Sequence, residues 1–384
     1  MVRSRTLVVA AVIATGLVVP GCSKPLVVGA VVAESGAVAD YGREVRKGIE
    51  LALEDANAAG GFHGKPIGIV FKDDQTRAEV GEQVTRELIE IDKVPAIIGA
   101  VSSPVTLRIA PLCEENRVVL ISPTASAPSI TAAGEYVYRV YPSDLLEGTS
   151  IADFARDLGL ERVVVVAVDD AFGAGLRDVF TQKFSSKYRQ VIETLMFPID
   201  DRSKLVDVAR KVAALAPEGV YVAAYATDVG EFLKELRATG SGAIVMGNSG
   251  FTEKVLQIAG TAAENLVYPQ PSFDPDSEDA ATRKFVTAFR AKYGAAPSRF
   301  AAHGYDAFQV LAKAIREGDS THPDNIRIGL TAIDNFQGAS GRLAFDSNGD
   351  IVQYPRIFVI RSGAPLAYEK FVEQGGKLTV PGAE

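Results

Sequence analysis

The stretch IIGAVSSPVTLRIAPLCEENRVVLISPTASAP, residues 97–128, decides the fold of this chain. Its apolar runs predict two buried strands, 96–99 and 118–121, joined by a helix over 104–116. A strand, a helix and a second strand in this order predict a right-handed crossover, which sets both strands parallel in one sheet. Hydroxyl-rich segments follow both strands, and ligands of such sheets bind beyond the carboxyl ends of the strands. We therefore expect both segments at one edge of the sheet, beside a ligand.

Ser103 is predicted to be the N-cap of this helix, with Pro104 at the first helical position, where a missing backbone N–H has no cost. The free backbone amides of a helix N-terminus favour an anion. We therefore predict that Ser103 and the loop from Thr124 to Ser126 hold a small anion, such as a carboxylate. Ordinary capping and turn chemistry is the alternative explanation of the same residues.

Short β-rich runs alternate with amphipathic helices along the rest of the chain. On the predicted helix 41–59, apolar residues recur at three- and four-residue spacing, which predicts one buried face. The alternation begins at residue 26 and starts again near residue 144, and 384 residues that are 47% hydrophobic suffice for two to three cores. The expected fold class is α/β, with two doubly wound lobes joined by a multi-strand hinge.

Late segments are expected to return to the lobes that earlier segments build. Two long predicted helices, 278–293 and 300–317, have no strand between them, so we expect them to pack on the first lobe. The expected division is lobe 1 from 26–143 and about 273–350, and lobe 2 from 144–272 and about 351–370.

The chain is predicted to close with a hairpin between strands 341–345 and 355–360. The sequence Asp346-Ser347-Asn348-Gly349 lies between them, and Asn-Gly is a strong signal for a tight turn.

Residues 1–21 have the pattern of a secretory signal peptide. Arg3 and Arg5 precede an apolar run over 7–19, which is shorter than the roughly 20 residues that span a bilayer. The end of this segment, Val19-Pro20-Gly21-Cys22, resembles a bacterial lipobox, so we predict that Cys22 is acylated and anchors the protein to a membrane. Plain secretion, with Cys22 free or in a disulfide, is the alternative.

The charge of the chain argues against nucleic acid and anionic lipid surfaces as partners. Removing residues 1–21 takes away two arginines and no acid, so the net charge changes from −8 to −10. The other cysteine, Cys113, lies on a predicted helix and is expected to be a buried, inert thiol.

Sequence motifs of catalysis and cofactor binding are absent. There is no G-x-S-x-G, H-E-x-x-H, C-x-x-C or P-loop. The segment 172–175, FGAG, follows a predicted strand, but Asp178 stands where a dinucleotide loop has its third glycine. We expect no catalytic residue, no cofactor and no metal, and a binding function rather than turnover.

Histidines and paired aspartates are interpreted as structural. The histidines are far apart in the sequence, and the aspartate pairs directly follow predicted strands, where helix capping and turn formation are the usual roles. These residues are His63, His303, His322, Asp73, Asp74, Asp169 and Asp170.

Four segments resemble the leucine/isoleucine/valine-binding protein family, the type 1 periplasmic binding proteins that feed ABC importers. The segments are AVVAESGAVADYG at 30–42, ALEDANAAGGFHGKPI at 52–67, IIGAVSSP at 97–104 and VLISPTASAP at 119–128. The resemblance covers about residues 26–365. It implies closure of two lobes over a small ligand, an ABC permease as partner, and a location in the periplasm or on the cell surface.

The resemblance also implies which residues contact the ligand. The family residues that hold the carboxylate and the ammonium of an amino acid correspond to Ser103, Thr124 and Ser126 of this chain. An acid near the ammonium site corresponds to Asp144. The aromatic walls correspond to Tyr41, Phe172, Tyr225 and Phe300, for which ordinary core or surface packing is the alternative.

One position departs from the family pattern. Amino-acid binders of the family have an acid where this chain has Ser249, and its loss removes a charge-assisted hydrogen bond of about 1.5–3 kcal/mol. Either Asp144 or Glu147 compensates, or the ligand lacks an ammonium group. The expected ligand is a branched-chain or hydrophobic amino acid, or a related small carboxylate.

Three functions follow from this pattern. The first is a lipid-anchored solute-binding protein of an ABC importer. The second is a sensor or regulatory lipoprotein of the same fold that binds an amide-like ligand or a protein. The third is a secreted α/β enzyme. A site open to a small ligand favours the first, and a site filled by side chains favours the second. Turnover of a bound ligand favours the third.

Overall fold

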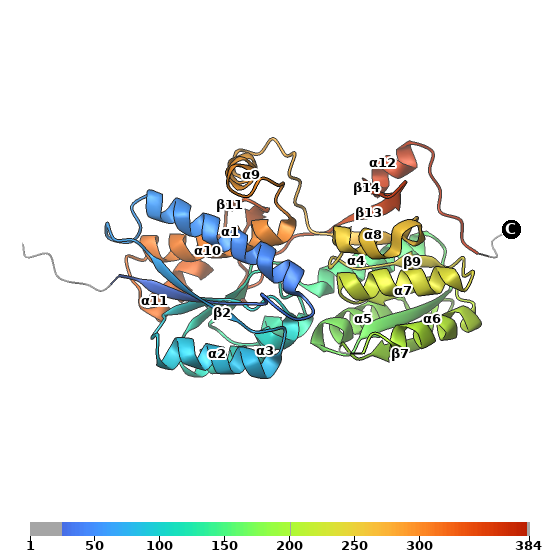
Figure 1. Ribbon diagram of the computed structural model, residues 1–384, viewed down its shortest axis with the longest axis horizontal. Helices are drawn as coiled ribbons and strands as arrows, with labels where there is room; N and C mark the ends of the chain where they lie inside the picture. Colours follow the sequence, from blue (N-terminus) through green and yellow to red (C-terminus); the bar gives the residue numbers. More distant parts are fainter. Residues whose placement is uncertain (1–24, 200, 382–384) are drawn as a thin grey trace, which may run out of the picture.

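The computed structural model of the protein describes residues 25–199 and 201–381. The chain forms two lobes side by side, each built on a β-sheet with helices packed against it (Figure 1). The predicted signal peptide, residues 1–21, and the predicted lipidation site, Cys22, lie outside the described residues. None of the described helices combines the length and the apolar character needed to cross a bilayer.

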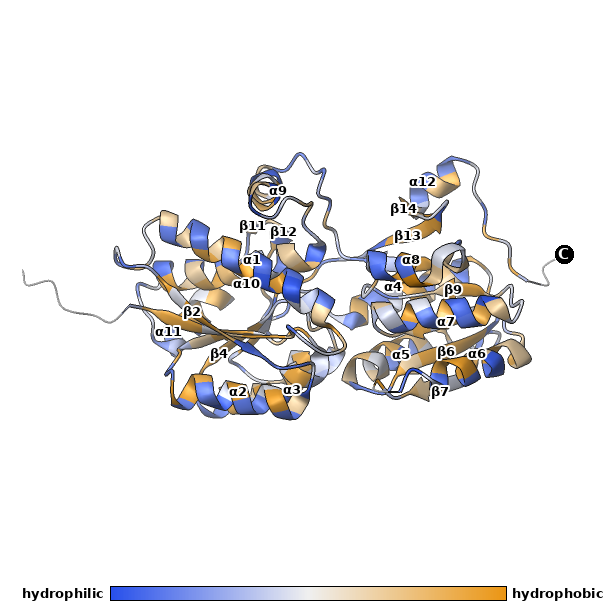
Figure 2. Ribbon diagram, in the orientation of Figure 1, coloured by the Kyte–Doolittle hydropathy of each residue, from blue (hydrophilic) through white to orange (hydrophobic). Residues whose placement is uncertain are grey.

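The first lobe contains a five-stranded parallel sheet in the order β2-β1-β3-β4-β5. Its strands are β1 (Val27–Val32), β2 (Gly68–Asp73), β3 (Ala96–Ile98), β4 (Val119–Ser122) and β5 (Val137–Arg139). The helices that accompany it are α1 (Ala39–Ala58), α2 (Ala78–Glu90), α3 (Ser103–Glu115), α9 (Ala280–Tyr293), α10 (Arg299–Glu317) and α11 (Pro323–Thr331). The strands are hydrophobic, whereas the helices alternate between hydrophobic and hydrophilic residues (Figure 2). This pattern explains why helices such as α2 and α3 pack one face on the sheet.

Helices α1 and α10 lie against each other over much of their length (Figure 1). Glycines permit their close approach. A Cβ atom at Gly48 would lie 1.9 Å from the carbonyl oxygen of Ala301, and one at Gly304 would lie 2.4 Å from the carbonyl oxygen of Val45. The two helices therefore touch backbone to backbone at these residues.

The second lobe contains a seven-stranded sheet in the order β14-β13-β10-β9-β8-β6-β7. Strand β13 is antiparallel to both of its neighbours, and the remaining pairs are parallel. The strands are β6 (Arg162–Val168), β7 (Gln190–Phe197), β8 (Gly219–Ala223), β9 (Ile244–Met246), β10 (Val267–Gln270), β13 (Arg356–Arg361) and β14 (Ala364–Ala367). The helices of this lobe are α4 (Asp144–Asp157), α5 (Ala171–Phe184), α6 (Lys204–Leu215), α7 (Ala226–Ala238), α8 (Glu253–Ala259) and α12 (Tyr368–Glu373).

The chain passes between the two sheets three times, after β5, after β10 and before β13. We propose these three connections as the hinge. We also propose the predicted lobes, 26–143 with 273–350 and 144–272 with 351–370, as the parts that move relative to each other.

The predicted closing hairpin is wrong. Strand β12 (Gly341–Leu343) pairs with β11 (Phe336–Gly338), and β13 pairs with β10 and β14. The predicted turn does form, because the amide of Gly349 donates to the carbonyl of Asp346 at 3.1 Å. However, the carbonyl of Gly349 accepts from the amide of Arg139 at 3.0 Å. The turn is thus held against β5 of the first sheet, which keeps β12 and β13 apart.

Candidate functional site

A cavity of about 30 Å³ lies between the lobes, and we call it the interlobe cavity. The structure brings eight of the nine predicted ligand residues to its wall, and Asp144 lies behind them. The predicted lining residues are Tyr41, Ser103, Thr124, Ser126, Phe172, Tyr225, Ser249 and Phe300. Val38, Val101, Ser102, Tyr141 and Gly250 complete the wall.

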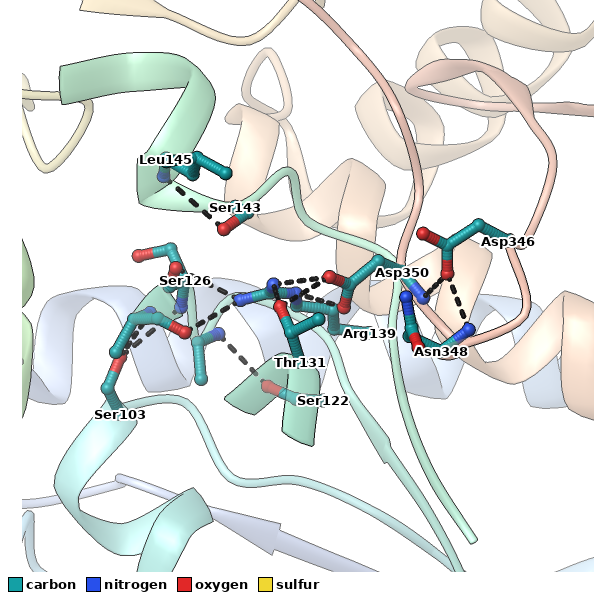
Figure 3. Close-up of polar contacts among 12 residues, drawn as sticks. Ser103, Ser122, Ser126, Thr131, Arg139, Ser143, Leu145, Asp346, Asn348 and Asp350 are labelled. Atoms are coloured by element: carbon teal, nitrogen blue, oxygen red, sulfur yellow. Dashed lines mark hydrogen bonds and ion pairs between the residues drawn. The ribbon is translucent and has the colours of Figure 1, made fainter. Parts of the chain in front are cut away.

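Ser103 supports the loop after β4. The predicted capping role is wrong, because α3 begins at Ser103 and its N-cap is Ser102, whose side chain makes no capping hydrogen bond. Ser103 therefore stands inside the first turn, and Pro104 at the second helical position. The hydroxyl oxygen of Ser103 accepts from the amides of Ser126 and Ala127 at 3.2 and 3.1 Å (Figure 3). The first helical turn and the loop after β4 are thus joined side by side.

Two further hydroxyl groups fix this loop to the end of β3. Thr124 donates to the carbonyl of Val101 at 2.8 Å, and Ser122 donates to the carbonyl of Ala100 at 2.8 Å. The predicted meeting of the two hydroxyl-rich segments at one sheet edge is confirmed.

A buried ion pair holds the loop from its other side. The guanidinium of Arg139 is 0% exposed and donates to both carboxylate oxygens of Asp350, at 2.6 and 2.7 Å (Figure 3). It also donates to the carbonyls of Ser126 and Ala127, at 3.0 and 2.9 Å. In the peptide group between Ser126 and Ala127, the carbonyl therefore points toward Arg139 and the amide toward Ser103.

Aromatic rings from both lobes form the walls of the interlobe cavity. Phe300 and Tyr41 stack with ring centres 4.4 Å apart, and Phe172 and Tyr225 stack at 5.1 Å. Tyr41 and Tyr225 meet at 6.4 Å, which joins the two pairs across the lobes. Stacked rings present flat apolar surfaces, which suit the side chain of a hydrophobic ligand.

The hydroxyl of Tyr41 bridges the lobes. It donates to the carbonyl of Gly250 at 2.6 Å and accepts from the amide of Ala226 at 2.8 Å. Burial raises the pKa of Tyr41 far above its ordinary value, so the group stays a neutral hydroxyl. These two bonds link the first lobe directly to the second.

Two buried carboxyl groups of α4 lie directly behind the wall. The backbone amide of Asp144 donates to the carbonyl of Ser126 at 2.8 Å, and Glu147 accepts from the amide of Ser249 at 2.9 Å. Burial raises the pKa of Glu147 to about 7, against the lowering effect of Ser249. Burial, reinforced by Glu147, also raises the pKa of Asp144 well above its ordinary range.

Sequence reasoning missed Tyr141 as a wall residue. It follows β5 at the first connection between the lobes and directly precedes Pro142. An aromatic residue just after a strand end, where the chain leaves a lobe, was an available signal. Gly250, whose carbonyl accepts from Tyr41, carries no side chain that could have indicated its place.

Two of the residues interpreted as structural cap helices. Asp170 caps α5 through the amides of Phe172 and Gly173, and His322 caps α11. Cys113 is buried, which raises the pKa of its thiol to about 12. Over residues 25–199 and 201–381, no three histidine, cysteine or acidic side chains gather in a way that could hold a metal ion.

We expect Ser103→Ala to lower the free energy of unfolding by about 1–3 kcal/mol. The substitution leaves the buried amides of Ser126 and Ala127 without their acceptor. Chemical denaturation measures the effect, and Ser347→Ala, in an exposed turn, is the control. Equal stability of the two variants would show that the hydroxyl of Ser103 does not hold the loop.

Known proteins match this chain over most of its length. A family model described as periplasmic binding protein matches residues 25–364. The Leu/Ile/Val-binding protein homolog 3 of Brucella melitensis is 27% identical over 333 residues, which are 85% of this chain and 88% of that protein.

Solved structures agree with this similarity. The branched-chain amino acid transporter substrate binding protein LivJ from Streptococcus pneumoniae, in complex with isoleucine, is 26% identical with a TM-score of 0.82 over 90% of this chain and 98% of its own. The leucine binding protein LivK from Thermotoga maritima is 28% identical, also with a TM-score of 0.82, over 89% of this chain and 97% of its own.

Proposed function

Because this chain belongs to the periplasmic binding protein family, we propose that it is the extracytoplasmic solute-binding lipoprotein of an ABC importer. Its resemblance to leucine/isoleucine/valine-binding proteins and its type 1 periplasmic fold with two lobes are confirmed. The names of these relatives are those of binding proteins, not of enzymes. The observation that carries the proposal is the interlobe cavity, with hydroxyl groups on one wall and aromatic rings from both lobes on the others.

The proposed ligand is a branched-chain or hydrophobic amino acid, or a related small carboxylate. The hydroxyl groups of Ser103 and Ser126 would receive its carboxylate, and that of Thr124 would join them on releasing the carbonyl of Val101. The rings of Tyr41, Phe172 and Tyr225 would cover its side chain. The interlobe cavity is smaller than such a ligand, so entry requires the lobes to separate and Tyr41 to release Gly250 and Ala226. Closure over the ligand then presents the loaded form to an ABC permease.

The small cavity also favours a second function. At about 30 Å³ it holds little more than a water molecule. A sensor or regulatory lipoprotein of this fold that binds a protein partner would need no larger site in its closed form. One that binds an amide-like ligand would need the lobes to separate, as the solute-binding protein does.

A thermal-shift screen of the protein lacking residues 1–22 separates these functions. The probes are leucine, isoleucine and valine, their keto-acid analogues, benzoate and short aliphatic amides. A ligand at 100 times its Kd stabilises the protein by about 2.7 kcal/mol, which raises Tm measurably. A shift with an amino acid or a small carboxylate supports the solute-binding role. A shift with amides alone supports the sensor, and no shift with any probe contradicts the solute-binding role.

We expect Cys22→Ser to release the protein from the membrane. Acyl chains on Cys22 would be its anchor, and serine cannot form the thioether. Fractionation of cells that express the full chain, followed by immunoblotting, measures the distribution. Cys113→Ser is the matched control and should stay in the membrane fraction, because Cys113 is buried. Membrane attachment of the Cys22 variant would rule out lipidation at this residue.

A further inference from the structure

Three carboxyl groups lie close to the wall of the interlobe cavity. Glu147 lies behind Ser249, Asp144 lies behind Ser126, and Asp170 accepts from the hydroxyl of Tyr225 at 2.8 Å. Asp144 is 0% exposed, and neither of its carboxylate oxygens has a hydrogen-bond partner among the described residues. Buried carboxylates are costly unless a positive group compensates them.

The nearby arginines do not pair with these carboxylates. Arg139 is paired with Asp350, and Arg202 is paired with Asp228. Arg299 donates instead to the backbone carbonyls of Ser249 and Phe251. No arginine forms an ion pair with Glu147, although the charge of Arg299 lowers its pKa, so above about pH 7 Glu147 carries a negative charge directly behind Ser249.

The side chain of Ser249 is the point where this charge reaches the cavity. Ser249 lines the cavity, and its amide is bonded to Glu147 at 2.9 Å, so one residue separates the carboxylate from the ligand space. A positively charged group that touches the hydroxyl oxygen of Ser249 would lie within range of Glu147, in surroundings where charge interactions are strong.

From this geometry we propose that Glu147, acting through Ser249, selects ligands that carry an ammonium group. The inference rests on the proposed function and narrows its ligand class to α-amino acids, to the exclusion of their des-amino analogues. Glu147 is a positioning residue here, because Ser249 rather than Glu147 touches the ligand. Asp144 lies one turn earlier on α4, and burial together with Glu147 raises its pKa, which favours its neutral form.

Protonation of Glu147 gives the selection a pH dependence. The titratable and charged groups that face Glu147 are Asp144, Tyr141, Tyr221 and Arg299. Burial raises the pKa of Glu147 to about 7, so the carboxylate is charged above this pH and neutral below it. Both charges of leucine stay constant between pH 6 and pH 8. Leucine should therefore bind more tightly at pH 8, whereas 4-methylpentanoate, its des-amino analogue, should not.

The test is calorimetric titration of wild type and Glu147→Gln with leucine and 4-methylpentanoate at pH 6 and pH 8. Glutamine keeps an oxygen for the amide of Ser249 and removes the charge. At pH 8 we expect the variant to lose about tenfold in leucine affinity, the size of one charge-assisted hydrogen bond, and to bind 4-methylpentanoate as wild type does. The variant should therefore lose the preference for leucine over 4-methylpentanoate that wild type shows at pH 8.

Glu218→Gln is the matched control. The carboxylate of Glu218 accepts from the amides of Glu161 and Arg162 at the start of β6. This is the end of the second sheet where the parallel strands begin, whereas Ser249 follows the end of β9. The ratio of leucine affinity to 4-methylpentanoate affinity in Glu218→Gln should equal that of wild type. An unchanged ratio in Glu147→Gln, or a wild-type preference for 4-methylpentanoate, overturns the inference and leaves the proposed function intact. Binding of neither probe at either pH refutes both.

Discussion

Replacing Arg139 with methionine is expected to lower the free energy of unfolding by about 3–5 kcal/mol. Methionine fills much of the same volume but leaves Asp350 buried without its partner. It also leaves the carbonyls of Ser126 and Ala127 without a donor. Because these carbonyls belong to the loop beside the interlobe cavity, ligand affinity should fall as well. Urea unfolding and calorimetric titration measure the two effects.

The control for Arg139→Met is an exposed ion pair. Arg210 and Asp207 are 71% and 76% exposed, so Arg210→Met should cost about 1 kcal/mol at most. The double variant Arg139→Met, Asp350→Leu should recover part of the loss, because it removes the unpaired charge. A loss below about 1 kcal/mol for Arg139→Met alone would show that the pair does not stabilise the first lobe.

Gly48→Ala is expected to cost about 3 kcal/mol, the upper end for added volume in a packed interior. The new methyl group would lie 1.9 Å from the carbonyl oxygen of Ala301 and 2.8 Å from the amide nitrogen of Tyr305. Both atoms belong to the backbone of α10, which cannot turn aside as a side chain can. Helices α1 and α10 must therefore move apart, and urea unfolding should detect the loss.

Gly242→Ala is the control for Gly48→Ala. A Cβ atom at Gly242 would meet its nearest neighbour, a side-chain atom of Pro381, only at 4.0 Å. Alanine there should leave stability unchanged or raise it slightly, because it reduces the freedom of the unfolded chain. Equal effects of the two substitutions would contradict a backbone contact between α1 and α10.

Local sequence patterns were sufficient for most elements of the two lobes. The apolar runs and Pro104 in residues 97–128 predicted β3, α3 and β4 to within about one residue at most ends. A difference of one position still mattered at Ser103. Because α3 begins at Ser103 and not at Pro104, the Ser103 side chain does not cap the helix and instead supports the loop after β4. Helix ends depend on such local competition, which spacing alone does not resolve.

Long-range contacts explain what the sequence did not reveal. The turn at Asn348-Gly349 was predicted correctly, but its flanking strands pair with other strands, and the turn itself is bonded to Arg139, which is far away in the chain. The placement of Glu147 behind Ser249 is likewise a contact between distant segments. The predicted aromatic wall came from a family resemblance and not from spacing, because a lone tyrosine in a loop has no periodic pattern.

The close pairing of α1 with α10 has a consequence for the order in which the protein folds. On the ribosome α1 is made early, but the helix that covers it is made only after every strand of the second sheet up to β10. The first lobe therefore cannot finish its core until α10 has been made, and such distant contacts form slowly. Late completion of the first lobe suits a polypeptide that is threaded unfolded through a membrane channel.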